Sequence, residues 1–182
     1  MFRTINYLES GNEVQRRAFQ VIHQLGILED MSKYNPVLCG TIPIAIDIKG
    51  SDLDIILEVY EPDRFSKDVK SRYGQLDGFV LRDLTMSDMP TVLTNFHYGG
   101  FEFELFAQPR AVEQQNAYLH MLVEHHLLMT NPQIKAEIIR LKEQGMKTEP
   151  AFAHVLGLAG DPYDELLVLG TELGVINGVG EL

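Results

Sequence analysis

The chain has 182 residues, of which 45% are hydrophobic and 23% are charged, as in ordinary globular proteins. Fifteen Lys and Arg against 26 Asp and Glu give a net charge of -11, so the summed field repels polyanions and a nucleic-acid partner is not expected. The single cysteine excludes an internal disulfide and a cysteine-based zinc site.

The same composition bears on location. No apolar stretch reaches the roughly 20 residues that a membrane span needs, and the first residues, MFRTINYLES, lack the apolar core of a signal peptide. We therefore expect a cytoplasmic protein without membrane contact. The single Cys39 stands beside Gly40 on an expected strand, so we expect a small buried apolar residue rather than a nucleophile.

The first part of the chain predicts a small sheet with helices. Ser10 or Asn12 is the expected cap of a first helix, which Gly26 ends. The further elements are a short strand after Pro36, a strand over about 51–59, a helix over 61–74 with Pro62 in its first turn, and a strand over 78–84. A hairpin of 91–98 and 101–108 turns at two glycines that suit a tight turn.

The second part of the chain predicts helices only, over 111–129, 131–145, 148–158 and 161–170. Asn131 and Asp161 are their expected caps, each followed by proline. The fold class is therefore α+β: a small mixed β-sheet of residues 1–110 with flanking helices, and a helical carboxyl-terminal region of residues 111–182 packed on that core.

Two carboxylates stand at the start of the second strand, in GTIPIAIDIKGSDLDI. Residues two apart in a strand share a face, which places Asp52 and Asp54 roughly 6.5 to 7 Å apart. At an effective dielectric constant near 20 their charges repel by about 2 kcal/mol, a cost that solvent or a bound cation must relieve. Mg²⁺ prefers carboxylate oxygens and completes its shell with water and phosphates, so this pair suits phosphoryl chemistry.

A third acid is expected from the strand FEFELFAQ, in which acids alternate with apolar residues. Glu104 lies deeper in that strand, whereas Glu102 is two residues past the glycine turn, where solvated charge costs little. We favour Glu104, and the sequence leaves Glu102 open.

These motifs carry a resemblance. Gly-Thr, a gap, then SDLDI, then an acid within FELF is similar to the signature of the DNA polymerase beta-like nucleotidyltransferase superfamily. Residues from about 12 onward also resemble an uncharacterised bacterial family assigned to that superfamily, through GTIPIAIDIKGSDLDI, FELFAQP followed by EQQNAYLHM, and GDPYDELL.

The resemblance implies an enzyme that moves a nucleoside monophosphate from a nucleoside triphosphate to an acceptor, with two Mg²⁺ ions, or Mn²⁺ in their place. The implied nucleotide-binding residues are Gly40, Thr41 and Ser51. The implied metal-binding and catalytic residues are Asp52, Asp54 and Glu104. The acidic composition favours a small-molecule or protein acceptor, with its hydroxyl or amine as nucleophile.

Alternatives stay open at this point. A catalytically inactive nucleotide- or partner-binding module is favoured by the β-branched Thr41 and by a loop whose only base is Lys49. A metal-dependent phosphohydrolase would use water in place of the acceptor. In LHMLVEHHLL, His120 and Glu124 share a helical face, and their pairing within a docked helix is favoured over a metal site.

Overall fold

The computed structural model describes residues 2–86 and 88–177. Its centre is a five-stranded sheet in the order β1-β2-β5-β4-β3. The strands are β1 (Val37–Cys39), β2 (Leu53–Glu58), β3 (Asp77–Met86), β4 (Met89–Tyr98) and β5 (Phe101–Gln108). β2 runs parallel to β5, and all other neighbours are antiparallel, which makes the sheet mixed. The α+β class expected from the sequence is confirmed.

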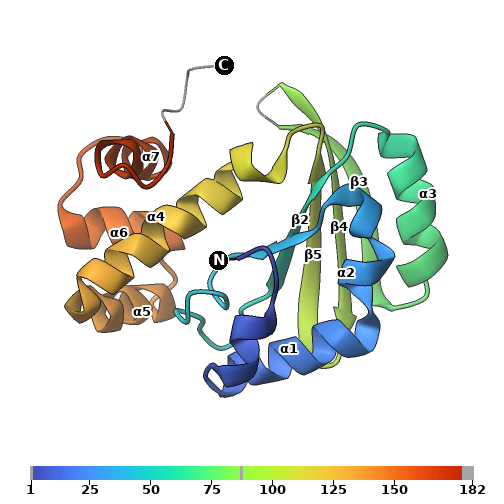
Figure 1. Ribbon diagram of the computed structural model, residues 1–182, viewed down its shortest axis with the longest axis horizontal. Helices are drawn as coiled ribbons and strands as arrows, with labels where there is room; N and C mark the ends of the chain where they lie inside the picture. Colours follow the sequence, from blue (N-terminus) through green and yellow to red (C-terminus); the bar gives the residue numbers. More distant parts are fainter. Residues whose placement is uncertain (1, 87, 178–182) are drawn as a thin grey trace.

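Helices lie on both sides of this sheet (Figure 1). Those before β4 are η1 (Asn6–Ser10), α1 (Glu13–Leu25), α2 (Ile27–Asp30), η2 (Ser32–Tyr34) and α3 (Pro62–Tyr73). Those after β5 are η3 (Val112–Gln114), α4 (Asn116–Thr130), η4 (Pro132–Ile134), α5 (Lys135–Glu143), α6 (Thr148–Leu156) and α7 (Pro162–Glu172). The expected boundary near residue 110 stays a prediction, and residues 178–182 of the expected helical region lie outside the described residues. No helix within 2–86 and 88–177 is long and apolar enough to cross a membrane.

Local chemistry accounts for both ends of α1. Asn12 caps α1 through a capping box with Gln15, and Gly26 ends it with φ 71°. Two predicted starts are wrong. The first helix after the sheet begins at Asn116 rather than 111, because a short 3-10 turn precedes it. Asn131 makes no side-chain capping bond, because another 3-10 turn separates it from α5.

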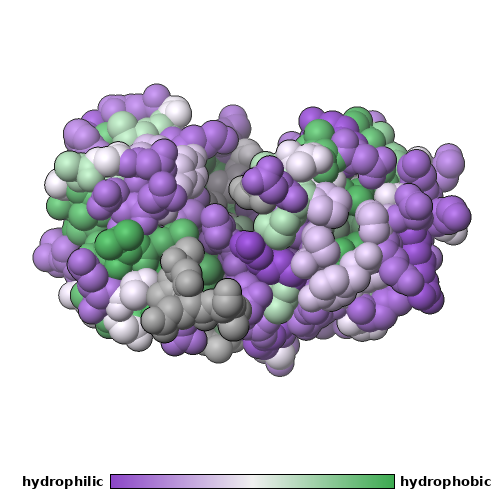
Figure 2. All heavy atoms as spheres, turned by 90° about the horizontal axis from the view of Figure 1, so that it is seen from above, coloured by the Kyte–Doolittle hydropathy of each residue, from purple (hydrophilic) through white to green (hydrophobic). Residues whose placement is uncertain are grey.

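Each sheet face is covered by its own hydrophobic core. Leu53, Ile55 and Leu57 of β2 pack with α1 and α3. Ile56 points the opposite way and packs with side chains of α4 to α7. Since side chains two apart share a face, Asp54 lies on the Ile56 face, at the margin of the helical core. Viewed from above, a hollow separates the lobe of α4–α7 from the lobe of the sheet and α3 (Figure 2).

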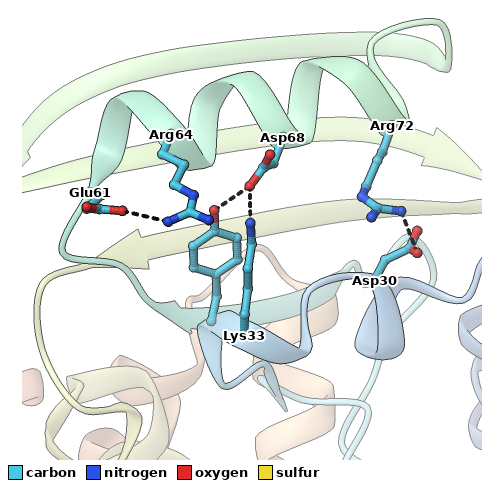
Figure 3. Close-up of polar contacts among 7 residues, drawn as sticks. Asp30, Lys33, Glu61, Arg64, Asp68 and Arg72 are labelled. Atoms are coloured by element: carbon cyan, nitrogen blue, oxygen red, sulfur yellow. Dashed lines mark hydrogen bonds and ion pairs between the residues drawn. The ribbon is translucent and has the colours of Figure 1, made fainter.

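Polar contacts join α3 to the segment that precedes β1 (Figure 3). Arg72 pairs with Asp30 at 2.6 Å, and Asp68 accepts from Lys33 at 2.5 Å and from the Tyr34 hydroxyl at 2.6 Å. Because the side chains of both ion pairs are between a third and a half exposed, each pair adds at most about 1 kcal/mol to stability. These contacts hold α3 against the segment of residues 30–34.

Candidate functional site

The acidic residues meet where β2 begins. Asp54 is opposite Cys39 of β1 and opposite Glu104 of the parallel strand β5. Neighbouring strands lie roughly 4.8 Å apart, so the Asp54 and Glu104 side chains leave the same sheet face side by side. β2 begins at Leu53, two residues later than expected, so Asp52 lies just before the strand. The charge of Asp52 still acts on Asp54.

Cys39 is 1% exposed, as expected of a small buried residue. Burial, with the nearby charge of Asp54 as a smaller cause, raises the pKa of its thiol. A neutral buried thiol is a poor nucleophile. Cys39 therefore packs in the hydrophobic core, at the β1 position opposite Asp54.

Gly40 allows the backbone to approach the acid closely. Its φ is 79°, and a Cβ built there would overlap Asp54 Oδ2 and lie 3.2 Å from Asp54 Cγ. The next residue, Thr41, donates its hydroxyl to Ser51 Oγ at 3.4 Å, and Ser51 Oγ accepts from the Ile48 amide at 3.0 Å. The predicted phosphate-binding residues therefore lie together, beside the acids.

The two candidate third acids differ in position. Glu104 is half-buried and faces Asp54, whereas Glu102 is exposed two residues closer to the turn. The Asn95 side chain of β4 donates to Glu104 Oε2 and to Glu102 Oε1, each at 3.2 Å. The geometry places Glu104, and not Glu102, against Asp54, with Asn95 fixing its orientation.

The site carries an excess of negative charge. Burial, followed by the negative charges of Asp52, Glu104 and Glu149, raises the pKa of Asp54 to about 8, while Lys142 acts in the opposite direction. Glu149 belongs to α6 and Lys142 to α5, so the helices after the sheet reach the acidic site electrostatically.

The pairing expected within α4 is wrong. His120 is buried and contacts the carbonyl oxygen of Tyr163 at 2.9 Å through Nε2, and its Nδ1 lies 3.7 Å from Glu149 Oε1. The side chain of Glu124 is 4% exposed, and its Oε1 has no hydrogen-bond partner. Burial raises the pKa of Glu124 well above its usual range.

Several residues near the acids have no local sequence signal. In the sequence, Asn95 is an ordinary polar residue of an alternating strand. Only the pairing of β4 with β5 places it beside Glu104. Lys142 and Glu149 lie far from the acids in sequence, in segments whose helical pattern predicts packing alone. Tertiary structure, rather than spacing, brings them to the site.

The donor set fits a hard divalent cation. Within 2–86 and 88–177, no group of at least three His, Cys, Asp or Glu side chains is arranged to hold a metal ion. Mg²⁺ is commonly held by one or two carboxylates together with water and substrate phosphates, so Asp54 with Asp52 or Glu104 meets that requirement. A cation there would also balance the mutual repulsion of these carboxylates.

Comparisons with known proteins come from a family model and from solved structures. The family model described as "Domain of unknown function (DUF4269)" matches residues 20–169. A comparison with curated proteins found no match.

Structural likeness extends over most of the chain. A chain of the GLD-2/RNP-8 complex aligns with a TM-score of 0.54 and 12% identity, over 98% of this chain and 68% of that chain. Cid1 poly(U) polymerase with Mg 3'-dATP bound aligns with a TM-score of 0.52 and 15% identity, over 92% of this chain and 52% of that chain. In two other Cid1 structures the aligned part is 41% and 39% of their length. The alignments with TM-scores of 0.54 and 0.52 show a nucleotidyltransferase-type fold.

Proposed function

The chain belongs to the DUF4269 family, and we propose that it is an Mg²⁺-dependent nucleotidyltransferase. It would transfer a nucleoside monophosphate from a nucleoside triphosphate to a hydroxyl or amine of a small-molecule or protein acceptor. The single observation that carries the proposal is the register that sets Asp54 against Glu104, with Gly40 packed on the Asp54 carboxylate.

The residues divide by role. Gly40, Thr41 and Ser51 would approach the triphosphate, because the loop ends that carry them meet beside the acids. Asp52 and Asp54 would hold Mg²⁺, and Glu104 would either complete the metal site or act as general base. When bound, the metal neutralises phosphate charge and orients the triphosphate.

The reaction requires one proton transfer by the protein. The acceptor oxygen or nitrogen forms a bond to the α-phosphorus, the bond from that phosphorus to the β-phosphate bridging oxygen breaks, and pyrophosphate leaves. Glu104 is the proposed general base that takes the acceptor proton. Its bonded partner Asn95 would hold the carboxylate toward Asp54 during that step.

The acceptor class follows from charge. The relatives in structure include a poly(U) polymerase, as its name states. This chain has a net charge of -11, which opposes the close approach of a polyanion. We therefore propose a small-molecule or protein acceptor, and a cytoplasmic location for the reaction.

One observation favours a binding module without turnover. Lys142, a base whose charge acts on Asp54, already donates to the carbonyl oxygen of Ile46 at 2.7 Å. A site in which that base is engaged has one cation fewer to stabilise the charge that develops during phosphoryl transfer, which favours binding over turnover.

An assay of turnover distinguishes a nucleotidyltransferase from a binding module without activity. α-³²P-labelled nucleoside triphosphates would be incubated with the protein, Mg²⁺ and panels of hydroxyl- and amine-bearing acceptors. Labelled acceptor with an equal amount of released pyrophosphate, absent in Asp54→Asn, supports transfer. Nucleotide binding with no labelled acceptor and no pyrophosphate supports the module.

A further inference from the structure

The connection between β1 and β2 is an ordered segment that joins the two hydrophobic cores. Ile42 is 1% exposed and packs in the core shared with α1 and α3. Ile44 and Ile46 are also buried but pack in the core formed with α4 to α7. The segment 41–50, here called the bridging loop, therefore has one part in each core, and both of its ends lie at the acidic site.

The first half of the bridging loop is held from α1. Gln15 is 7% exposed, and its Nε2 donates to the carbonyl oxygens of Ile42 at 2.8 Å and of Pro43 at 3.2 Å. The Oε1 of the same side chain accepts from the Asn12 amide at 2.9 Å, which fixes the orientation of the Gln15 amide group. The capping-box partner of Asn12, Gln15, thus also supplies a buried donor to the loop.

The second half is held from α5. Lys142 is 6% exposed, and its Nζ donates to the Ile46 carbonyl oxygen at 2.7 Å. Burial of an ammonium group is costly unless it is hydrogen-bonded and near negative charge. Lys142 has that negative charge from Glu124 and Asp47, which oppose the effect of burial on its pKa.

The position of the loop ends depends on these two contacts. Inside the loop, the Ile46 amide donates to the Thr41 carbonyl oxygen at 3.1 Å, which closes a turn directly after Gly40. A shift of the Ile46 backbone is therefore transmitted to Thr41, and through the Thr41 hydroxyl to Ser51.

We propose that Gln15 and Lys142 are positioning residues that hold the bridging loop in the shape that binds a nucleoside triphosphate. This inference rests on the proposed function. It makes nucleotide affinity depend on the helical region after the sheet, through a single carbonyl group of the loop.

Two substitutions remove the donors while preserving size. Gln15→Glu keeps the acceptor for the Asn12 amide and removes the donor to Ile42 and Pro43. Lys142→Met keeps most of the buried stem and removes the ammonium group. Lys147→Met is the matched control, because Lys147 is exposed at the start of α6.

Hydrogen exchange on the nucleotide-free protein reports on the loop without any assumption about function. The amides of Ala45 and Ile46 are hydrogen-bonded inside the loop, and the Ile48 amide is hydrogen-bonded to Ser51 Oγ just beyond it. We expect these amides to exchange about tenfold faster in Gln15→Glu and in Lys142→Met, with strand amides and Lys147→Met unchanged. Unchanged exchange at these amides in both variants would overturn the inference.

Calorimetric titration of Mg²⁺-ATP then tests the positioning role. We expect the dissociation constant to rise about tenfold in both variants and to stay at the wild-type value in Lys147→Met. Faster loop exchange with unchanged affinity would overturn the positioning role. Failure of the wild-type protein to bind any nucleoside triphosphate would instead overturn the proposed function, and with it the nucleotide part of this inference.

Discussion

Replacing Gly40 with alanine tests the contact between the loop and the acid. The new Cβ would lie 3.2 Å from Asp54 Cγ and overlap Oδ2, so the carboxylate must move by on the order of 1 Å to reach ordinary contact. The φ of 79° adds a second penalty, because a side chain in the left-handed region costs about 1 kcal/mol.

The backbone penalty is measured by unfolding, and the displacement of the carboxylate is measured by nucleotide binding. The backbone penalty lowers the free energy of unfolding by about 1 kcal/mol. Displacing Asp54 removes a charge-assisted contact to the proposed metal, worth roughly 1.5 to 3 kcal/mol, which corresponds to a loss of Mg²⁺-ATP affinity of roughly 10- to 150-fold.

Gly26→Ala is the matched control for this variant. Gly26 has φ 71°, and nothing lies within 4 Å of a Cβ built there. Urea unfolding should show a loss of about 1 kcal/mol in Gly26→Ala and a loss at least as large in Gly40→Ala, whereas calorimetry should show weakened Mg²⁺-ATP binding only in Gly40→Ala. Equal affinity in the two variants would refute the idea that Gly40 positions the Asp54 carboxylate.

The remaining predictions concern individual side chains. Burial and neighbouring negative charges raise the pKa of Asp54 to about 8, so without divalent cations the folded protein keeps a proton that the unfolded chain loses near pH 4. Stability should therefore fall as pH rises from about 4 to about 8, by at most about 1.4 kcal/mol per pH unit, and urea unfolding of Asp54→Asn should lack this contribution. Glu104→Gln should weaken Mg²⁺-ATP binding at least about tenfold in calorimetry while Glu102→Gln changes it little, and the reverse order would exclude Glu104 as the third acid. Asp161→Ala should lower the free energy of unfolding by about 1 kcal/mol in urea titrations, because its side chain accepts from two amides at the start of α7, and unchanged stability would contradict that cap.

Local chemistry made much of the fold predictable. The α1 helix follows from Asn12 and Gly26, and the β4–β5 hairpin follows from a glycine pair between alternating strands. The alternation of acids with apolar residues in β5 also indicated that Glu104, rather than Glu102, would lie deeper in the sheet, and the structure places it against Asp54.

The rest of the site depends on contacts between distant segments. Lys142 lies in an ordinary amphipathic helix, and nothing near it in the sequence indicates that its ammonium group bonds the Ile46 carbonyl oxygen. Gln15 was predictable as part of a helix start, but its second role as a donor to the loop was not. The apolar loop TIPIAIDIKG was expected only as a connection, because Pro43 and Gly50 interrupt it. Its isoleucines alternate as they would in a strand, and only the tertiary structure divides them between the two cores.

The most direct test of the central claim is calorimetric titration of ATP, GTP, CTP and UTP into the protein, with and without Mg²⁺, with Asp54→Asn as control. The account predicts Mg²⁺-dependent binding of at least one of these nucleotides and its loss in a folded Asp54→Asn protein. Absence of binding for all of them, or binding that is equal in Asp54→Asn, would contradict a nucleotide site built on these acids.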